Sequence, residues 1–238
     1  MERKPHISDD MRSRRLKALK IERLLDLKPG PQPLRMLEVG TGSGGIANYF
    51  GTHPSLACDV DAIDVHDNRV VLDGYRFRLV ADTTLPFADA AFDVVISNHV
   101  MEHVGDENAQ REHLAELRRV LAPGGVGYLA VPNRWMIVEP HYRVPFLSWL
   151  PRSWRSGYLR LFGKGSFYDV EPLQLRQLEK LLQDADLRFE NLCLPALRAT
   201  IELEDGRGAL LSILKTIPDS ILVPFRRLVP TLIYRFHR

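Results

Sequence analysis

Glycines and an acidic residue near the start of the chain are spaced as in a site for a nucleotide-type ligand. The run from Leu37 to Gly45 reads LEVGTGSGG, and Glu38 stands two residues before the first glycine. Glycine lets the backbone turn tightly and approach a ligand, and the following helix start offers unpaired N–H groups. The spacing departs from the dinucleotide fingerprint G-x-G-x-x-G, and Glu38 would repel a pyrophosphate. The run therefore favours a ligand with a hydrogen-bond donor or a positive charge beside Glu38.

Two further acids close strand-like runs downstream. Asp64 ends the run 57–65 and lies about twenty residues past the glycines, where a βαβ nucleotide site places a carboxylate on the ribose hydroxyls. Asp82 ends the run 77–82 in the same way. Because the carboxyl ends of parallel strands meet at one edge of a sheet, both acids are expected beside the glycine run.

Two longer motifs complete the series: FDVVISNHVMEH at 92–103 and LRRVLAPGG at 117–125. Together with the glycine run and the two acids, they resemble class I S-adenosylmethionine (SAM) dependent methyltransferases of the type 11 domain family. The resemblance implies SAM as the cofactor and S-adenosylhomocysteine as the product, with Glu38 at the amino-acid end, Asp64 at the ribose and Asp82 at the adenine. The cofactor contacts that it implies are Glu38, Gly40, Thr41, Gly42, Gly44, Asp64, Val65, Asp82, Thr83 and Asn98.

Alternating strands and helices are needed to bring these residues together. The patterns predict strands at 34–39, 57–65, 77–81, 92–97, 126–131, 188–195 and 231–236, with helices after the first strand, weakly after the second, and at 107–121 and 172–184. This alternation is typical of a doubly wound, mostly parallel α/β sheet. The resemblance implies seven strands, the last antiparallel. A helix at 8–28, capped by Ser8 or Asp9, is expected to cover the sheet.

Two insertions interrupt this single expected domain of residues 1–238. The first, 133–168, is rich in aromatic residues, follows the fifth strand and is the candidate acceptor-site lid. The second, 197–230, is expected to be helical. Its part from about 208 to 227 should form short helices broken at Pro218 and Pro224, with an apolar face flanked by arginines. That face packs on its own domain or, alternatively, makes peripheral contact with an anionic membrane.

Methyl transfer is an in-line displacement, so an enzyme gains most by holding the acceptor close to the methyl carbon, and an oxygen acceptor also needs a base. We expect that base near the ends of the fourth and fifth strands. His141 is the favoured candidate, with Tyr142 beside it, and His99, directly after the fourth strand, is the second. His103 belongs to a Glu-His pair that suits a structural hydrogen bond.

The acceptor is suggested by resemblance alone. The run PHYRVPFLSWLP at 140–151 and the ending PTLIY resemble a bacterial subgroup associated with surface glycan and lipid-linked saccharide pathways. This implies O-methylation of a sugar or another small hydroxylated acceptor. Two alternatives stay open. One is a non-catalytic SAM-binding scaffold domain. The other is a nicotinamide-dependent oxidoreductase, which the departure from the dinucleotide fingerprint disfavours.

Composition and spacing argue against several other classes. The 238 residues carry a formal net charge of +2, which gives no reason to expect nucleic acid binding. The sequence does not determine the oligomeric state. Cys58 and Cys193 lie in strand-like runs without zinc spacing. His99 and His103 would share a metal ion only on one continuous helix, so none is expected. The charged N-terminus and the absence of a long apolar run predict a cytoplasmic protein.

Overall fold

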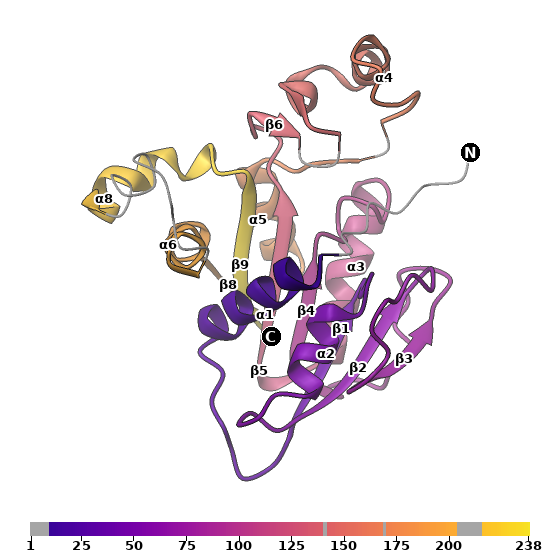
Figure 1. Cartoon of the computed structure of the whole chain (residues 1–238), viewed down its shortest axis with the longest axis vertical. Helices are drawn as coiled ribbons and strands as arrows, with labels where there is room; N and C mark the ends of the chain where they lie inside the picture. The colour runs from indigo at the N-terminus through magenta and orange to yellow at the C-terminus, as the bar shows by residue number, and fades with distance from the viewer. Residues whose placement is uncertain (1–9, 140–141, 169, 204–215) are drawn as a thin grey trace.

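Strand β4 (Phe92–Asn98) lies at the centre of a seven-stranded sheet whose order is β3-β2-β1-β4-β5-β9-β8 (Figure 1). The computed structural model describes residues 10–139, 142–168, 170–203 and 216–238. The other strands are β1 (Leu34–Val39), β2 (Cys58–Asp64), β3 (Arg76–Leu79), β5 (Leu121–Pro132), β8 (Arg188–Asn191) and β9 (Thr231–His237). Strand β9 runs antiparallel to β5 and β8, whereas the other pairs in this sheet are parallel. The mostly parallel sheet with an antiparallel last strand is confirmed.

The strand order reverses beside β1. The chain leaves β1 for β2 and β3 on one side and then returns to pair β4 with the other side of β1. In doubly wound sheets, ligands bind outside the carboxyl ends of the strands at such a point. The topology therefore brings the glycine run, Asp64 and the residues after Asn98 to one edge.

Helices cover both faces of the sheet (Figure 1). They are α1 (Met11–Leu25), α2 (Gly45–Gly51), α3 (Glu107–Val120), α5 (Leu175–Asp184) and α6 (Cys193–Leu203). Met36 of β1 lies in one core cluster with α1, α2 and α6, and the next residue, Leu37, lies in the other with α3 and α5. Successive strand residues point to opposite faces, so an apolar strand such as β1 supplies both cores.

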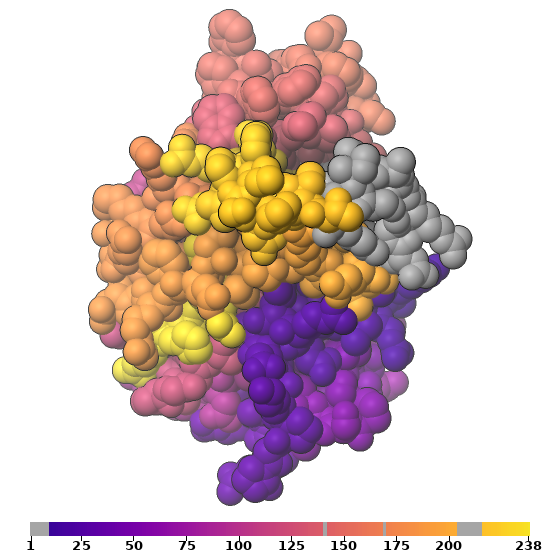
Figure 2. Space-filling model, turned by 90° about the vertical axis from the view of Figure 1, so that its left-hand side faces the viewer, coloured from indigo at the N-terminus to yellow at the C-terminus, as the bar shows by residue number. Residues whose placement is uncertain are grey.

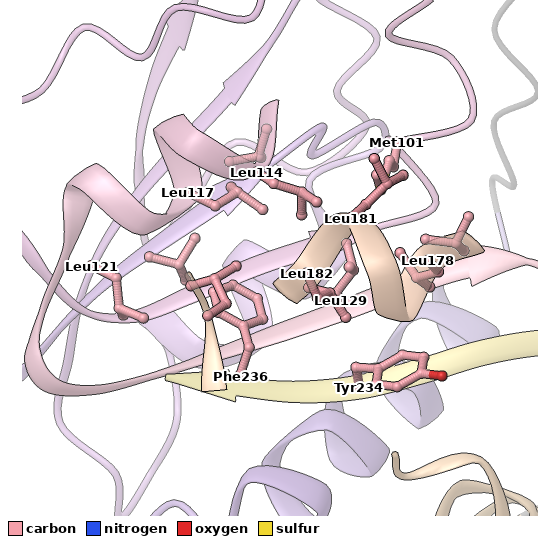
Figure 3. Packing of buried hydrophobic residues seen from close by; sticks show 14 of the residues in the cluster. Met101, Leu114, Leu117, Leu121, Leu129, Leu178, Leu181, Leu182, Tyr234 and Phe236 are labelled. Atoms are coloured by element: carbon pink, nitrogen blue, oxygen red, sulfur yellow. The ribbon is translucent and has the colours of Figure 1, made fainter. Parts of the chain in front are cut away.

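The leucines of α3 and α5 pack together over β5 and β9 (Figure 3). Leu114, Leu117 and Leu181 are at most 2% exposed, and the spacing within α3 is that of one helix face. The side chain of Asp106 caps α3 by accepting from the amides of Asn108 and Ala109 at 3.0 and 3.1 Å. The helix therefore begins at the next residue, Glu107.

The connection between β2 and β3 differs from the expected weak helix. Residues 65–75 form turns and bends, so that prediction is wrong. The segment contains Asp, Asn and Gly, which favour turns, and its Val70 and Val71 amides donate to the Ser43 carbonyl at 2.9 and 3.1 Å. The Tyr75 hydroxyl also donates to the Val71 carbonyl. These bonds fix the connection to the glycine loop.

The strand expected at 188–195 ends early, at Asn191. The Asn191 side chain accepts from the amide of Cys193 at 3.1 Å, which is how an asparagine starts a helix. Cys193 therefore begins α6 instead of lying in a strand, and the helical insertion starts before residue 197. At the other end of the chain, Asp10 caps α1. The expected caps Ser8 and Asp9 lie outside the described residues.

Residues 133–168, which we call the lid segment, stand beyond the carboxyl ends of the strands (Figure 1). The described part contains a short hairpin of β6 (Val138–Glu139) and β7 (Val144–Pro145), a 3₁₀ turn η1 (Leu147–Trp149) and helix α4 (Arg152–Leu161). It has a small core, formed by its Val144, Leu147, Leu159 and Tyr168 together with Val170, which follows the segment. The segment is thus a separately packed layer rather than an extended loop.

The second insertion follows α6. Its described part holds α8 (Asp219–Leu222), which begins directly after Pro218, and the 3₁₀ turn η2 (Val223–Arg227), which contains Pro224. Short helices with a boundary at Pro218 are confirmed there, whereas Pro224 lies inside η2 and does not break a helix. Residues 204–215 lie outside the description. In Figure 2 the insertion, in yellow, lies directly below the lid segment. Within the described ranges, no helix has the length and apolarity needed to cross a membrane.

One glycine tests the packing between the last two long strands. Gly127 of β5 pairs with Phe236 of β9, and a Cβ at Gly127 would overlap the Phe236 ring. Gly127→Ala should lower the free energy of unfolding by about 1–3 kcal/mol, because the buried ring must move. Gly157→Ala in the exposed interior of α4 is the control and should stabilise by about 0.5–1 kcal/mol. Urea denaturation measures both, and equal effects would contradict the packing.

Candidate functional site

The glycine loop after β1 is shaped by its neighbours. Gly40, Gly42 and Gly44 have positive φ angles of 72°, 55° and 81°, which residues with a Cβ rarely adopt. A Cβ at Gly40 would overlap Val100, and one at Gly44 would overlap the Tyr75 hydroxyl. Two of the three glycines therefore let protein segments approach closely, whereas Gly42 has room for a Cβ in ordinary contact with Arg14.

Glu38 lies beneath this loop and holds it to α2. Its buried carboxylate accepts from the Thr41 hydroxyl at 2.7 Å and from the Ala47 amide at 2.9 Å. Burial raises the pKa of Glu38 to about 8, against the lowering effects of the Thr41 bond and of the positive charge of Arg14. The carboxylate predicted to meet a ligand thus also braces the loop that would bind it.

Asp64 joins the end of β2 to the same loop. One of its carboxylate oxygens accepts from the Gly42 amide at 2.8 Å, and the other accepts from the Val65 amide at 2.7 Å. The second oxygen also accepts from the His66 amide at 3.3 Å, whereas the oxygen bonded to Gly42 retains a lone pair, so Asp64 can still accept from a hydroxyl of a ligand. The main-chain carbonyl of Asp64 also accepts from the Val80 amide at the end of β3.

Asp82 follows Val80 by two residues and lies at the same edge of the sheet. It is exposed, and its carboxylate accepts from the Thr84 amide at 2.8 Å. Thr83 is half-buried beside it, Val65 is exposed after β2, and Asn98 is half-buried at the end of β4. The structure therefore gathers the predicted cofactor residues at the ends of β1 to β4.

Arg14 is a residue of this site that the sequence reasoning missed. Its Nη2 lies 3.7 Å from the position that a Cβ of Gly42 would occupy, and its charge acts on Glu38. Arg14 precedes Ala18 by four residues, and Ala18 and Ile21 form the buried face of α1. The available signal for Arg14 was its position in the sequence, a cation on the face of an amphipathic helix that is otherwise apolar.

A histidine and a buried carboxylate form the second part of the site, in the turn after β4. His99 has a positive φ of 60°, and its Nδ1 lies 3.2 Å from Oε1 of Glu102. Burial would raise the pKa of Glu102, but the hydrogen bond and charge of His99 and the charge of His103 hold it below its ordinary value. Glu102 is therefore ionised at neutral pH and orients the His99 ring.

The same turn excludes the helical metal arrangement. Residues 99–105 form bends and turns, so His99 and His103 do not share one helix face. Across the ranges that the structure describes, no three His, Cys, Asp or Glu side chains cluster as metal ligands. A separate buried pair lies behind β4, where the Ser97 hydroxyl is 3.0 Å from Nε2 of His113 and burial lowers the pKa of His113 to about 4.

The lid segment reaches the turn after β4 through residue 171. The Glu171 amide donates to the Glu102 carbonyl at 3.0 Å, and the Glu171 carboxylate lies 3.9 Å from Nη1 of Arg155 in α4. The Tyr142 hydroxyl donates to the Phe167 carbonyl at 3.3 Å, so it holds the lid segment together. His141, the favoured base candidate, lies outside the described residues.

Comparison with known proteins agrees with this geometry. A methyltransferase domain family matches residues 37–129, which run from the end of β1 into β5. Residues 37–129 of this chain are therefore similar to a methyltransferase domain, over less than half of its length. The matched residues include Glu38, the glycine loop, both strand-end acids and the His99–Glu102 turn.

Relatives of the domain act on different acceptors. A ubiquinone biosynthesis O-methyltransferase of Brucella melitensis is 31% identical over 67% of this chain and 63% of its own length. A probable tRNA methyltransferase 9B of Mus musculus is 31% identical over 43% of this chain and 22% of its own length. This chain thus spans less than two thirds of either relative.

The fold of the domain also has solved counterparts. A phosphoethanolamine N-methyltransferase 2 of Haemonchus contortus in complex with S-adenosyl-L-methionine matches with a TM-score of 0.52 and 16% identity. The match covers 92% of this chain and 51% of the other. The class I methyltransferase fold is confirmed.

Protonation of Glu38 in the methyltransferase domain gives a test that needs no ligand. Because its pKa is raised to about 8, the folded protein holds a proton that the unfolded chain releases above the ordinary value of 4.5. The stability that this proton contributes is complete below pH 4.5 and is lost as the pH rises through 8. Glu38→Gln stays neutral, so between those limits wild type should lose about 1 kcal/mol per pH unit relative to the variant.

Urea denaturation across this pH range measures the difference. Glu116→Gln is the control, because the hydrogen bond from Arg119 lowers the pKa of Glu116 and removes its titration from this range. A difference between wild type and Glu38→Gln that stays constant with pH would show that Glu38 is ionised throughout.

Proposed function

We propose that this chain binds SAM and transfers its methyl group to a hydroxyl oxygen of a small acceptor, such as a saccharide. The observation that carries the proposal is the pairing of His99 with a buried, ionised Glu102 at the edge that holds the glycine loop. Val100, the residue after His99, occupies the space that a Cβ of Gly40 would need. The turn with the base candidate is therefore packed directly against the loop.

The residues at the strand ends suit SAM. Bound SAM would supply a methyl group on a positively charged sulfur. Glu38 provides a buried carboxyl group beside the loop for the amino-acid end, Arg14 provides a cation for a carboxylate, and Asp64 provides an acceptor for ribose hydroxyls. The solved counterpart from Haemonchus contortus, which is in complex with SAM, supports the assignment.

Proton removal is the chemistry that the His99–Glu102 pair can perform. With Nδ1 held by Glu102, the Nε2 atom of His99 is the position that can take a proton from an acceptor hydroxyl. The carboxylate stabilises the imidazolium that results, as in other pairs of this kind. O-methylation by the Brucella melitensis relative supports an oxygen acceptor.

The lid segment offers hydrogen-bond donors for an oxygen-rich acceptor. Arg155 is 3% exposed, and its Nη1 has no hydrogen-bond partner among the residues that the structure describes. The buried hydroxyls of Ser148 and Tyr168 likewise have none there. Burial raises the pKa of Tyr168, so its hydroxyl keeps its proton and can donate. Unsatisfied buried donors of this sort favour a ligand that brings oxygens.

Cofactor binding separates the proposal from its rivals. Calorimetry should show binding of SAM and not of NADH, and NADH binding without SAM binding would favour the oxidoreductase. Arg14→Gln should weaken SAM binding by about ten- to a hundredfold, as expected for a lost charged hydrogen bond. Arg12→Gln, an exposed position on the same helix, is the control and should keep wild-type affinity. Equal affinity of the two variants would remove Arg14 from the site.

Turnover identifies the base. With radiolabelled SAM and an extract of small hydroxylated acceptors, His99→Gln should lower the rate by about 10²- to 10⁴-fold while SAM affinity is kept. Glu102→Gln should also lower the rate, because the carboxylate that orients the His99 ring is lost.

The same assay includes the other base candidate and the non-catalytic alternative. Loss of turnover in His141→Ala but not in His99→Gln would assign the base to His141. SAM binding without methyl transfer to any fraction of the extract would favour the scaffold domain.

A further inference from the structure

Exposed apolar side chains gather on two segments of the surface. Among the described residues, sixteen large apolar side chains are exposed, and twelve of them lie in the lid segment and the second insertion. Trp154 and Leu161 of α4 are 67% and 80% exposed. The others are Ile137, Val138, Phe146, Trp149, Phe162, Phe167, Ile221, Val223, Phe225 and Leu228. Scattered exposure is normal, but such concentration marks an interaction surface.

The charge of the lid segment is one-sided. Residues 142–167 contain five basic residues and no acid, although the whole chain has a net charge of only +2. Arg143, Arg152, Arg160 and Lys164 are exposed between the aromatic side chains. The fifth, Arg155, is buried. The exposed cations therefore flank the exposed apolar residues with few anions to balance them.

The two segments belong to one side of the molecule. The Asn133 side chain, at the base of the lid segment, donates to the carbonyls of Arg227 and Val229, each at 2.7 Å. The main-chain amide of Asn133 donates to the Pro230 carbonyl at 3.0 Å. Figure 2 shows the insertion against the lower margin of the lid segment. We call their exposed apolar and basic side chains together the apolar-basic face.

We propose that the apolar-basic face docks on the surface of an anionic lipid bilayer. Aromatic side chains with interspersed Arg and Lys suit the headgroup region, where apolar parts enter the acyl boundary and cations pair with phosphates. The lid segment stands beyond the carboxyl ends of the strands, and Glu171, which follows it, donates its main-chain amide to the Glu102 carbonyl in the His99 turn. If the proposed O-methylation is right, docking presents the site to an amphiphile whose hydroxyl lies at headgroup level.

The side-chain types favour lipid over RNA or a protein partner. RNA binds single-stranded bases by stacking on aromatic rings, and exposed Leu161, Ile221 and Leu228 have no ring for a base to stack on. A protein partner would cover the face with apolar area and would not require an excess of cations. A bilayer uses both features at once.

Vesicle flotation tests docking without any dependence on turnover. The full chain should float at low salt with phosphatidylcholine vesicles containing about one third phosphatidylglycerol, and far less with phosphatidylcholine alone. SAM binding, measured in parallel, shows whether the proposed function holds independently. Failure to float while SAM binds would overturn docking alone.

Variants locate the contact. The double variant Trp154→Ser, Leu161→Ser should lower the vesicle partition by at least about tenfold, because both side chains leave water on docking. Arg160→Gln with Lys164→Gln should weaken binding to anionic vesicles by about tenfold and remove much of its salt dependence. The matched control is Val70→Ser with Leu72→Ser, which are 55% and 59% exposed near β3 and should float as wild type.

Tryptophan fluorescence gives a second readout. In the Trp135→Phe, Trp149→Phe background, Trp154 is the remaining tryptophan, and its emission should shift to the blue on anionic vesicles and be quenched by brominated acyl chains. Equal flotation of wild type and the Trp154, Leu161 double variant would overturn the proposal. The proposal would also be overturned if the Trp154 emission shifted to the blue only on addition of RNA. A blue-shifted Trp154 in a dimer that vesicles do not change would overturn it as well.

Discussion

The buried carboxylate of Glu38 is the constraint on which the arrangement of the site depends. A buried carboxyl group needs hydrogen-bond partners, and Oε2 of Glu38 accepts from both the Thr41 hydroxyl and the Ala47 amide. These bonds lock the glycine loop to the first turn of α2. The locked loop then presents the Gly42 amide to Asp64. One buried acid thus fixes the relation between the ends of β1 and β2.

The same loop determines where the second half of the site can lie. Because Gly40 has no Cβ, Val100 packs against the loop, and the turn that carries His99 and Glu102 is drawn towards it. The main chain of Glu102 in turn holds Glu171, which adjoins the lid segment through Arg155. A continuous set of contacts therefore runs from the cofactor edge to the lid. Each step is a packing contact, a hydrogen bond or a charge contact between elements far apart in sequence.

Local sequence signals predicted the parts of the fold that depend on local physics. Six-residue apolar runs such as β1 and the capped leucine stripe of α3 carry their own period and end signals, and both lie where they were expected. The segment 65–75 has neither signal. The amides of its Val70 and Val71 donate to the carbonyl of Ser43, a residue distant in the chain. The early end of β8 has a local cause, because the side chain of Asn191 accepts from the amide of Cys193, two residues on, where α6 begins.

The site was predictable to the extent that strand ends are predictable. Motif spacing placed Glu38, Asp64 and Asp82 at one edge, but it gave no reason to expect that the first two would be bonded to the loop backbone. Arg14 reaches the loop only through the docking of α1, and Arg155 reaches Glu171 only through the packing of α4. Contacts between elements of this kind follow from tertiary geometry, which single-residue patterns do not encode.

The sheet divides the two tasks of the molecule between its halves. Strands β3, β2, β1 and β4 end in the residues that suit a cofactor, whereas β5 and β9 lead into and out of the lid segment and the second insertion. The antiparallel pairing of β9 with β5 brings Thr231 opposite Pro132, so the lid segment starts beside the point where the second insertion ends. The long chain segments between β5 and β9 can therefore differ in sequence while the cofactor half keeps its geometry. Under the proposed function, the lid segment and the insertion are the parts that meet the acceptor, and the exposed basic and apolar side chains are concentrated there.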